Sequence, residues 1–150
     1  MIPTAPAGMP NPTRILAIDY GEHRIGMALS DELCIIATGL PTLRNTSHLI
    51  EEILEVTQRS NVARIIVGLP LTLKGDVGTS ANAVLGFVER LRQNTGTPVE
   101  TYDERFTSSL AEDTMRRGGM KRSLRREKGK VDEIAAVILL QDYLNSRSMR

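Results

Sequence analysis

The feature that most constrains this 150-residue chain is a short apolar segment that ends in an acid. Residues 14–19 read Arg-Ile-Leu-Ala-Ile-Asp, with almost no alternation of apolar and polar side chains. This pattern is typical of a strand in a sheet whose two faces are both covered. We therefore expect a central strand at Arg14–Asp19, with the carboxylate of Asp19 at its end.

The segments that follow predict how this strand is paired. Gly21 permits a turn into a second strand at Arg24–Ser30, and a third strand is expected within Cys34–Leu43. Short turns between the three strands predict antiparallel neighbours. The later elements are expected to be strands at Arg64–Gly68 and Pro98–Tyr102 and helices at His48–Ser60, Thr79–Asn94, Thr107–Arg117 and Val131–Asn145. This order predicts an α/β fold with a mixed five-stranded sheet flanked by helices.

Length and composition indicate one folded domain with an N-terminal tail. A chain of 150 residues with 41% hydrophobic residues fits a single domain with a normal core. Residues 1–13 hold four of the seven prolines, so we expect a disordered tail there and the folded domain at 14–150. No apolar run reaches the ~18 residues of a membrane span, and Cys34 has no second cysteine to pair with. We expect a reduced, cytoplasmic protein that does not bind membranes.

Positive charge is concentrated in one segment, Arg116–Lys130. It contains eight of the 19 Lys and Arg residues and one acid, Glu127, whereas the net charge of the whole chain is only +1. Such a patch favours contacts with a phosphate backbone. Aromatic residues are only 3% of the chain and are absent from this segment, which argues against recognition by base stacking. The alternative interpretation is a solvated loop.

Carboxylates follow or begin three of the expected elements. Asp19 ends the first strand, Asp103 and Glu104 follow the strand at Pro98–Tyr102, and Asp132 begins the last helix. Each has an ordinary explanation, namely a turn, a solvated strand end or a helix cap. Adjacent strand residues face opposite ways, so only one of Asp103 and Glu104 can face Asp19, and the sequence leaves this choice open.

The last helix carries a pattern that bears on Asp132. Ala135, Ala136 and Leu139 follow on the same face, and this small-residue face would let the helix approach the sheet closely. Glu133 is expected to point away into solvent. Together the acids predict a site with oxygen ligands for Mg²⁺ or Mn²⁺. Two such ions can hydrolyse a phosphodiester without a serine or cysteine nucleophile.

The chain also resembles a known family through an ordered set of short segments. These are Asp19-Tyr20-Gly21, Arg24-Ile25-Gly26, Ser30-Asp31, Val67-Gly68-Leu69-Pro70 with Gly75, Asp103 to Thr107, and Lys130-Val131-Asp132 with Ala135-Ala136. In this order and spacing they resemble the YqgF family, also called RuvX, over about residues 14–144. His23 and Met27 stand where Lys and Val are common, and neither position is one of the acids.

The resemblance implies an RNase H-like fold and a metal-dependent nuclease. The family's acidic site would map to Asp19, Glu104 and Asp132, with Mg²⁺ or Mn²⁺ as cofactor. Members are linked to Holliday-junction resolution and to maturation of the 16S rRNA 5′ end, so the expected partner is branched DNA or precursor rRNA. Junction resolvases act as dimers, and the sequence leaves open whether this chain forms a homodimer.

The leading hypothesis is therefore a hydrolase, a two-metal endonuclease acting on structured nucleic acid. The residues expected to contact the nucleic acid are Arg105, Arg116, Arg117, Lys121, Arg122, Arg125, Arg126 and Lys130. One alternative is a non-catalytic nucleic-acid or ribosome-binding factor that retains the fold. Another is an actin-like ATPase, which a chain of this length disfavours because it lacks a second lobe to enclose a nucleotide.

Overall fold

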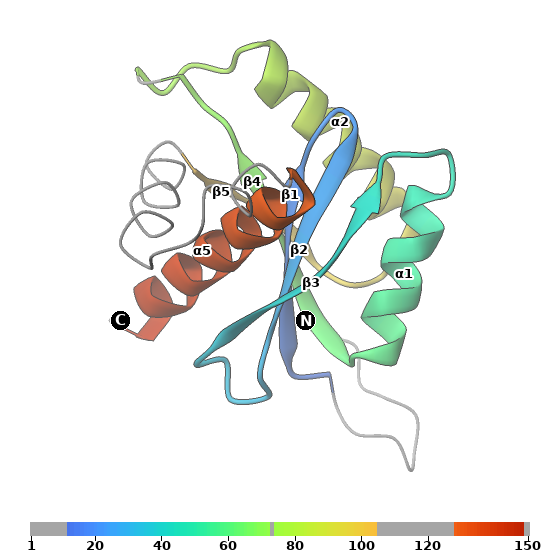
Figure 1. Ribbon diagram of the computed structural model, residues 1–150, viewed down its shortest axis with the longest axis vertical. Coiled ribbons are helices and arrows are strands. Elements are labelled where there is room, and N and C mark those ends of the chain that lie inside the picture. Colours follow the sequence, from blue (N-terminus) through green and yellow to red (C-terminus); the bar gives the residue numbers. More distant parts are fainter. Residues whose placement is uncertain (1–11, 73, 105–127, 149–150) are drawn as a thin grey trace.

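The computed structural model describes residues 12–72, 74–104 and 128–148, without the side chains of residues 128–130 and 148. Most of the predicted tail and the predicted helix at Thr107–Arg117 lie outside these residues. Within the described ranges the elements form a sheet with helices on both of its faces (Figure 1).

Five strands form one mixed sheet in the order β3-β2-β1-β4-β5. Its strands are β1 (Arg14–Tyr20), β2 (Arg24–Ser30), β3 (Ala37–Arg44), β4 (Val62–Leu69) and β5 (Val99–Asp103). The first three strands pair antiparallel, whereas β4 and β5 run parallel to β1. The predicted mixed five-stranded sheet is therefore confirmed, and the first strand occupies its centre.

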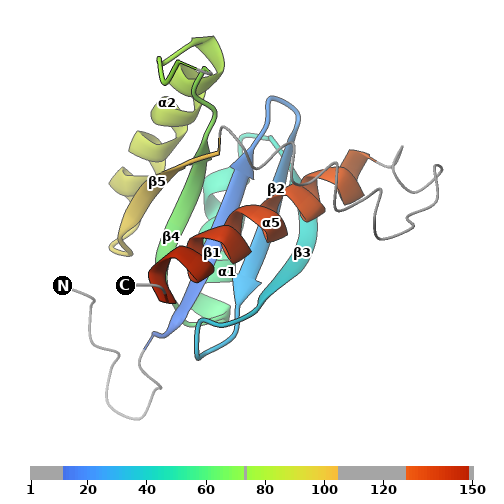
Figure 2. The same ribbon diagram turned by 90° about the vertical axis from the view of Figure 1, so that its left-hand side faces the viewer.

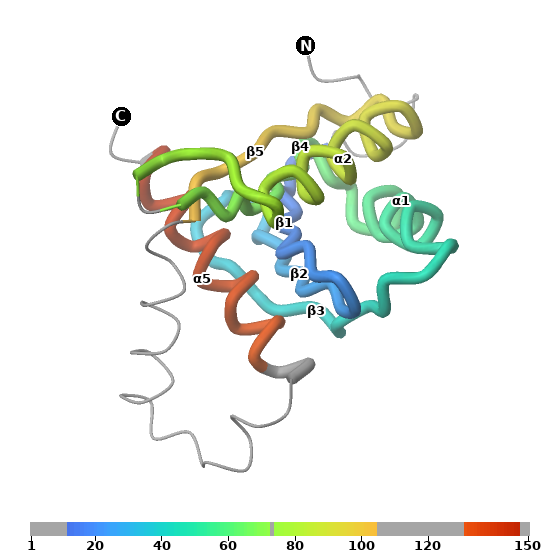
Figure 3. The backbone as a smooth tube through the Cα atoms, turned by 90° about the horizontal axis from the view of Figure 1, so that it is seen from above, coloured from blue at the N-terminus to red at the C-terminus, as the bar shows by residue number. Residues whose placement is uncertain are grey.

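The described helices lie in two layers. Helix α5 (Lys128–Ser148) crosses one face of the sheet, and α1 (Leu49–Arg59) and α2 (Thr79–Asn94) cover the other (Figures 2 and 3). Each interface has its own apolar cluster. The cluster under α1 and α2 includes Phe87, and the cluster under α5 includes Leu139 and Leu140.

The lack of alternation in β1 is explained by these two layers. Ile15–Ile18 is fully buried, with Leu16 and Ile18 packed toward α1 and α2 and Ile15 and Ala17 packed toward α5. Side chains two residues apart on a strand share a face. Asp19 therefore lies on the face that α5 covers, in line with Ile15 and Ala17.

Most predicted ends differ from the structure by at most two residues, and the larger differences fall in two elements. The last helix spans Lys128–Ser148 rather than about Val131–Asn145, and within the expected range Cys34–Leu43 the third strand begins only at Ala37. Asp31 Oδ1 accepts hydrogen bonds from the backbone N–H groups of Ile35 and Ile36, at 2.7 and 2.9 Å, and Cys34 adopts a positive φ of 58°. Because the carboxylate of Asp31 organises this turn, Cys34 belongs to the turn and not to the strand.

In the part of the chain that the structure describes, no helix has the length and apolar character needed to cross a membrane.

Candidate active site

The candidate site lies at the edge of the sheet where the parallel strands end. β1, β4 and β5 run in the same direction, so their carboxyl ends meet at one edge, the usual position of ligand sites in such sheets. Asp19 lies near the end of β1, and Glu104 directly follows β5. Asp132 comes to this edge on α5.

Gly26 allows α5 to approach this edge closely. It is the register partner of Asp19 on the neighbouring strand β2. A Cβ atom on Gly26 would lie 2.7 Å from the carbonyl carbon of Asp132 and still nearer to the carbonyl oxygen. Because Gly26 has no side chain, the backbone of α5 can contact the sheet at this position. Asp132 therefore lies against Gly26, the residue paired with Asp19 on the neighbouring strand.

Glu104, rather than Asp103, faces the site. A Cβ atom on Gly68 of β4 would lie 2.9 Å from Cδ of Glu104, so the carboxyl group of Glu104 fills the space over that glycine. Leu139 of α5 borders the same space, at 3.1 Å from the same position. Asp103 is exposed. The choice that the sequence left open is thus decided by a glycine that makes room for the Glu104 side chain.

The protonation of two acids reflects their burial and their proximity. The pKa of Asp19 is raised to about 6, first by burial and then by the charge of Asp132. The pKa of Glu104 is raised to about 7, again first by burial and then by the charges of Asp19 and Asp103. Asp19 therefore interacts electrostatically with both of the other predicted site acids.

Asp132 forms an ion pair rather than a helix cap. Arg24 Nε donates a hydrogen bond to Asp132 Oδ2 at 3.0 Å, and both side chains are partly buried. Since α5 begins at Lys128, Asp132 lies beyond the first turn, where capping and dipole effects act. The helix-cap explanation of Asp132 is therefore wrong.

The site is a shared edge and not a preformed metal cage. Among the described residues, no three His, Cys, Asp or Glu side chains lie close enough together to hold a metal ion. Mutual repulsion of like charges and the Arg24 ion pair both act against closer convergence of the acids. The donor set nevertheless fits a hard cation, since all three side chains offer carboxylate oxygens and two have raised pKa values that a nearby cation would lower.

Comparison with known proteins identifies the family. Residues 13–146 match the sequence model of a family described as "RuvX: Holliday junction resolvase". The chain belongs to the RuvX family. It is similar to a Phocaeicola vulgatus protein named "Putative pre-16S rRNA nuclease", with 46% identity over 90% of this chain and 97% of that protein. A protein of the same name from Chloroflexus aurantiacus is 42% identical, over 89% of this chain and 87% of its own length.

A solved structure shows the same fold. Thermus thermophilus RuvC in complex with a Holliday junction substrate superposes with a TM-score of 0.56 at 19% identity, covering 91% of this chain and 96% of RuvC. At this identity the likeness concerns the fold alone. The predicted RNase H-like fold is confirmed.

Helix α5 of this RuvX-family chain is anchored to the sheet by partly buried hydrogen bonds. Tyr102 on β5 donates to Asp142 at 2.6 Å. Arg64 on β4 donates to Glu100 at 2.8 Å, and Tyr143 donates to the same Glu100 oxygen at 2.8 Å. These bonds fix the C-terminal half of α5, and so determine where its N-terminal half, with Asp132, crosses the sheet.

Two expectations about α5 need correction. Glu133 was expected in solvent, but it is partly buried and its side chain packs over Gly39 of β3, where a Cβ atom would lie 2.6 Å from its Cγ. The buried face was expected to include Ala135, which is only partly buried. The buried positions of α5 are Ala136, Leu139, Leu140, Tyr143 and Leu144.

The basic residues predicted to contact nucleic acid are not placed by the structure. Those that lie outside the described residues are Arg105, Arg116, Arg117, Lys121, Arg122, Arg125 and Arg126. Lys130 lies in α5, but its side chain is not described.

Sequence reasoning missed Arg24 as a site residue. Its signal was present, because Arg24, Gly26 and Ala28 are spaced by two on β2 and so share the face that α5 covers. A charged residue on the same strand face as buried small residues indicates an oppositely charged partner on the helix that covers that face.

Proposed function

We propose that this RuvX-family chain is a metal-dependent endonuclease that hydrolyses phosphodiester bonds in structured nucleic acid. Its substrate class is branched DNA of the Holliday-junction type, the 5′ end of precursor 16S rRNA, or both. The observation that carries the proposal is the position of Asp19, Glu104 and Asp132 on one face at one sheet edge, with all three side chains partly buried. The names of the similar proteins support the choice of substrates.

The proposed cofactor is Mg²⁺ or Mn²⁺, held by these three carboxylates. A pair of such ions supplies activation of a water molecule and stabilisation of the leaving oxygen. The raised pKa values of Asp19 and Glu104 support a cation at this edge, because an added positive charge would offset the repulsion between buried acids. In a non-catalytic binding factor, acids beside a bound phosphate would repel it and would weaken binding.

The surrounding residues would position these ligands. Arg24 holds the Asp132 carboxylate through the 3.0 Å bond and so restricts its orientation. Gly26 and Gly68 leave the space that Asp132 and Glu104 occupy. The basic segment, with Arg105 and Lys130, would contact the phosphate backbone and neutralise nearby charge.

A cleavage assay with a matched variant tests the proposal. The purified protein is incubated with Mg²⁺ or Mn²⁺ and either a labelled four-way DNA junction or a labelled precursor 16S rRNA 5′ fragment. We expect metal-dependent cleavage by the wild type, and loss of cleavage in Asp19→Asn with the fold intact. Asn keeps the size of the side chain but removes the charge, and the variant also excludes a contaminating nuclease.

Each outcome of this assay assigns a role. Symmetric cuts in two opposing strands of the junction would support a resolvase that acts as a homodimer, and cleavage of the RNA alone would support a processing nuclease. Binding without cleavage of either substrate would support the non-catalytic factor instead. Cleavage retained by Asp19→Asn would show that the metal site has been assigned to the wrong residues.

A further inference from the structure

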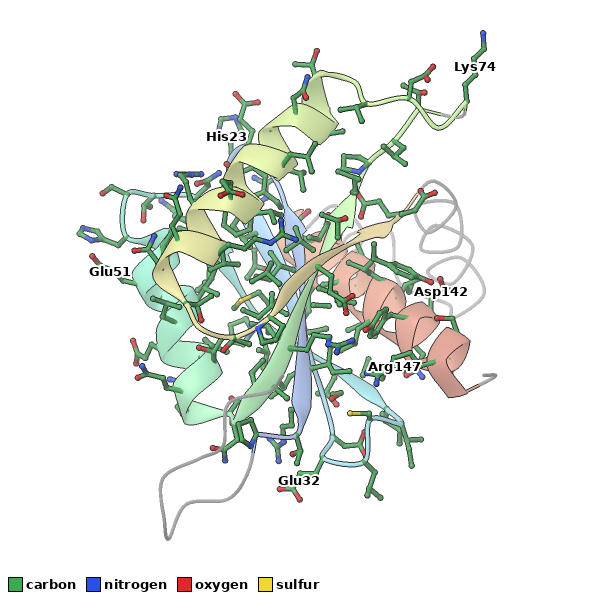
Figure 4. All side chains as sticks on the ribbon, turned by 180° about the vertical axis from the view of Figure 1, so that it is seen from behind. His23, Glu32, Glu51, Lys74, Asp142 and Arg147 are labelled. Carbon is green, nitrogen blue, oxygen red and sulfur yellow. The ribbon has the colours of Figure 1, made fainter. Side chains whose placement is uncertain are left out.

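A basic cavity lies directly beside the acidic edge. It has a volume of about 410 Å³ and is lined by His23, Arg24, Arg44, Asn45 and Thr46. His23, in the turn between β1 and β2, lies toward the opposite end of the molecule from Glu32, which is in the turn between β2 and β3 (Figure 4). The cavity therefore opens at the same end of the sheet as the three carboxylates.

Two arginines that line this cavity lie side by side on neighbouring strands. Arg24 on β2 and Arg44 on β3 are direct register partners, so their side chains leave the same face of the sheet. Like charges placed opposite each other on antiparallel strands are destabilising. Asp132 offsets the charge of Arg24, but no ion pair or side-chain hydrogen bond within the described residues involves the guanidinium of exposed Arg44. Within the described part of the chain, the charge of Arg44 therefore has no compensating acid.

The cavity wall is held by hydrogen bonds rather than left as a loose loop. The Asn45 side chain donates to the Gly21 carbonyl at 2.9 Å, and the Asn45 backbone N–H donates to the His23 carbonyl at 3.0 Å. These two bonds tie the turn before β2 to the segment after β3. These bonds therefore hold the backbone of His23 close to that of Asn45, which directly follows Arg44.

Arg24 links the cavity to the proposed cleavage site. Its Nε donates to Asp132, and a guanidinium has five N–H donors in a planar fork suited to phosphate oxygens. Acids near the cavity are few among the described residues. Glu22 lies 4.0 Å from His23, but both side chains are largely exposed and such a pair contributes little.

We infer that this cavity binds a phosphodiester group of the substrate strand, adjacent to the bond that is cleaved, with Arg44 and Arg24 as its anion-binding residues. The inference rests on the proposed function and adds a substrate contact to it. A phosphate would offset the charge of Arg44 and could accept further hydrogen bonds from the Arg24 guanidinium. The ligand chemistry is common to DNA and RNA, so both are tested.

Binding without cleavage isolates this contact. Fluorescence anisotropy in EDTA measures the affinity for a labelled four-way DNA junction and for a labelled precursor 16S rRNA fragment over a series of salt concentrations. Arg44→Gln is compared with Arg90→Gln, a control in which an exposed arginine of α2 loses the same charge. Thermal melting confirms that both variants fold. Arg24 is left unchanged because it also contacts Asp132.

For the substrate that occupies the cavity, Arg44→Gln is expected to weaken binding about tenfold. The slope of log binding constant against log salt concentration should become shallower by about one, as for the loss of one phosphate contact. Arg90→Gln should bind as the wild type does. Equal affinities and salt slopes for the two variants, with wild-type cleavage intact, would overturn the cavity assignment and leave the proposed function standing. A wild type that neither binds nor cleaves either substrate would overturn the proposed function, and the cavity assignment with it.

Discussion

Asp19 and Glu104 bind protons more tightly than ordinary carboxyl groups. Burial is the largest cause for each, and the charge of a neighbouring acid is the next. The pKa of Asp19 rises from 3.8 to about 6, and that of Glu104 rises from 4.5 to about 7. A carboxyl group with a raised pKa in the folded state favours folding when it is protonated and loses that contribution as it ionises.

We predict that the stability of the metal-free protein depends on pH through these two groups. For Asp19 the contribution is fully present below pH 3.8 and is lost as the pH rises through about 6. Urea denaturation in EDTA across this range measures the free energy of unfolding. The wild type should lose stability relative to Asp19→Asn, because the asparagine cannot ionise.

The difference between these two proteins should become constant only well above pH 7, where Asp19 and Glu104 are both ionised in the folded and the unfolded state. A difference that is the same at every pH would contradict the assigned burial and proximity of Asp19.

The sequence predicted the acids but not which of two neighbours would be used. Asp19, Glu104 and Asp132 could be proposed because each adjoins an expected element. The choice between Asp103 and Glu104 depends on the space over Gly68, which is a property of the neighbouring strand. Arg24 was missed because its partner, Asp132, is 108 residues away in the sequence.

At the scale of elements, the position of α5 depends on small residues in the strands beneath it. Three glycines lie in these strands, Gly26 on β2, Gly39 on β3 and Gly68 on β4. Residues of α5 fill the space over Gly26 and Gly39, and Glu104, which follows β5, fills the space over Gly68. The groups that fill these spaces differ. Backbone atoms of Asp132 lie over Gly26, whereas side-chain atoms of Glu133 lie over Gly39.

We predict unequal effects of the same substitution at two of these glycines. Gly26→Ala places a methyl group against the backbone of α5, so the helix must move and take Asp132 with it. We expect a loss of about 1–3 kcal/mol in the free energy of unfolding, together with loss of cleavage. Gly39→Ala should cost less, because the Glu133 side chain can rotate away.

Chemical denaturation and the cleavage assay, run on both alanine variants, check this prediction. Equal stability and equal activity in the two variants would show that α5 does not depend on close contact at Gly26.

Element types were predictable from periodicity, whereas some of their ends were not. The span Thr79–Asn94 was predicted and is the span of α2. The start of α5 at Lys128 was missed, because the basic run before Asp132 has no apolar periodicity to mark it as helical. The late start of β3 depends on the Asp31 turn, whose hydrogen bonds are a property of three-dimensional geometry.

At the scale of the whole molecule, the proposed metal site joins parts of the chain that are far apart in sequence. Asp19 lies in β1, Glu104 follows β5, and Asp132 lies in α5. The sequence restricts the order of the strands in the sheet, because short turns place strands side by side and strand-helix-strand units add parallel neighbours. The placement of the three acids at one edge also required the α5 crossing, which the small-residue pattern indicated only in part.

The central claim, that these acids form one metal site, is tested most directly by thermal unfolding with and without Mn²⁺ at pH 8. A ligand that binds only the folded state raises its stability, by about 2.7 kcal/mol at 100 times Kd. We predict that Mn²⁺ raises the Tm of the wild type and of the control Asp103→Asn, whose substituted side chain is exposed, but not that of Asp19→Asn. No rise in the wild type, or an equal rise in Asp19→Asn, would contradict the assignment.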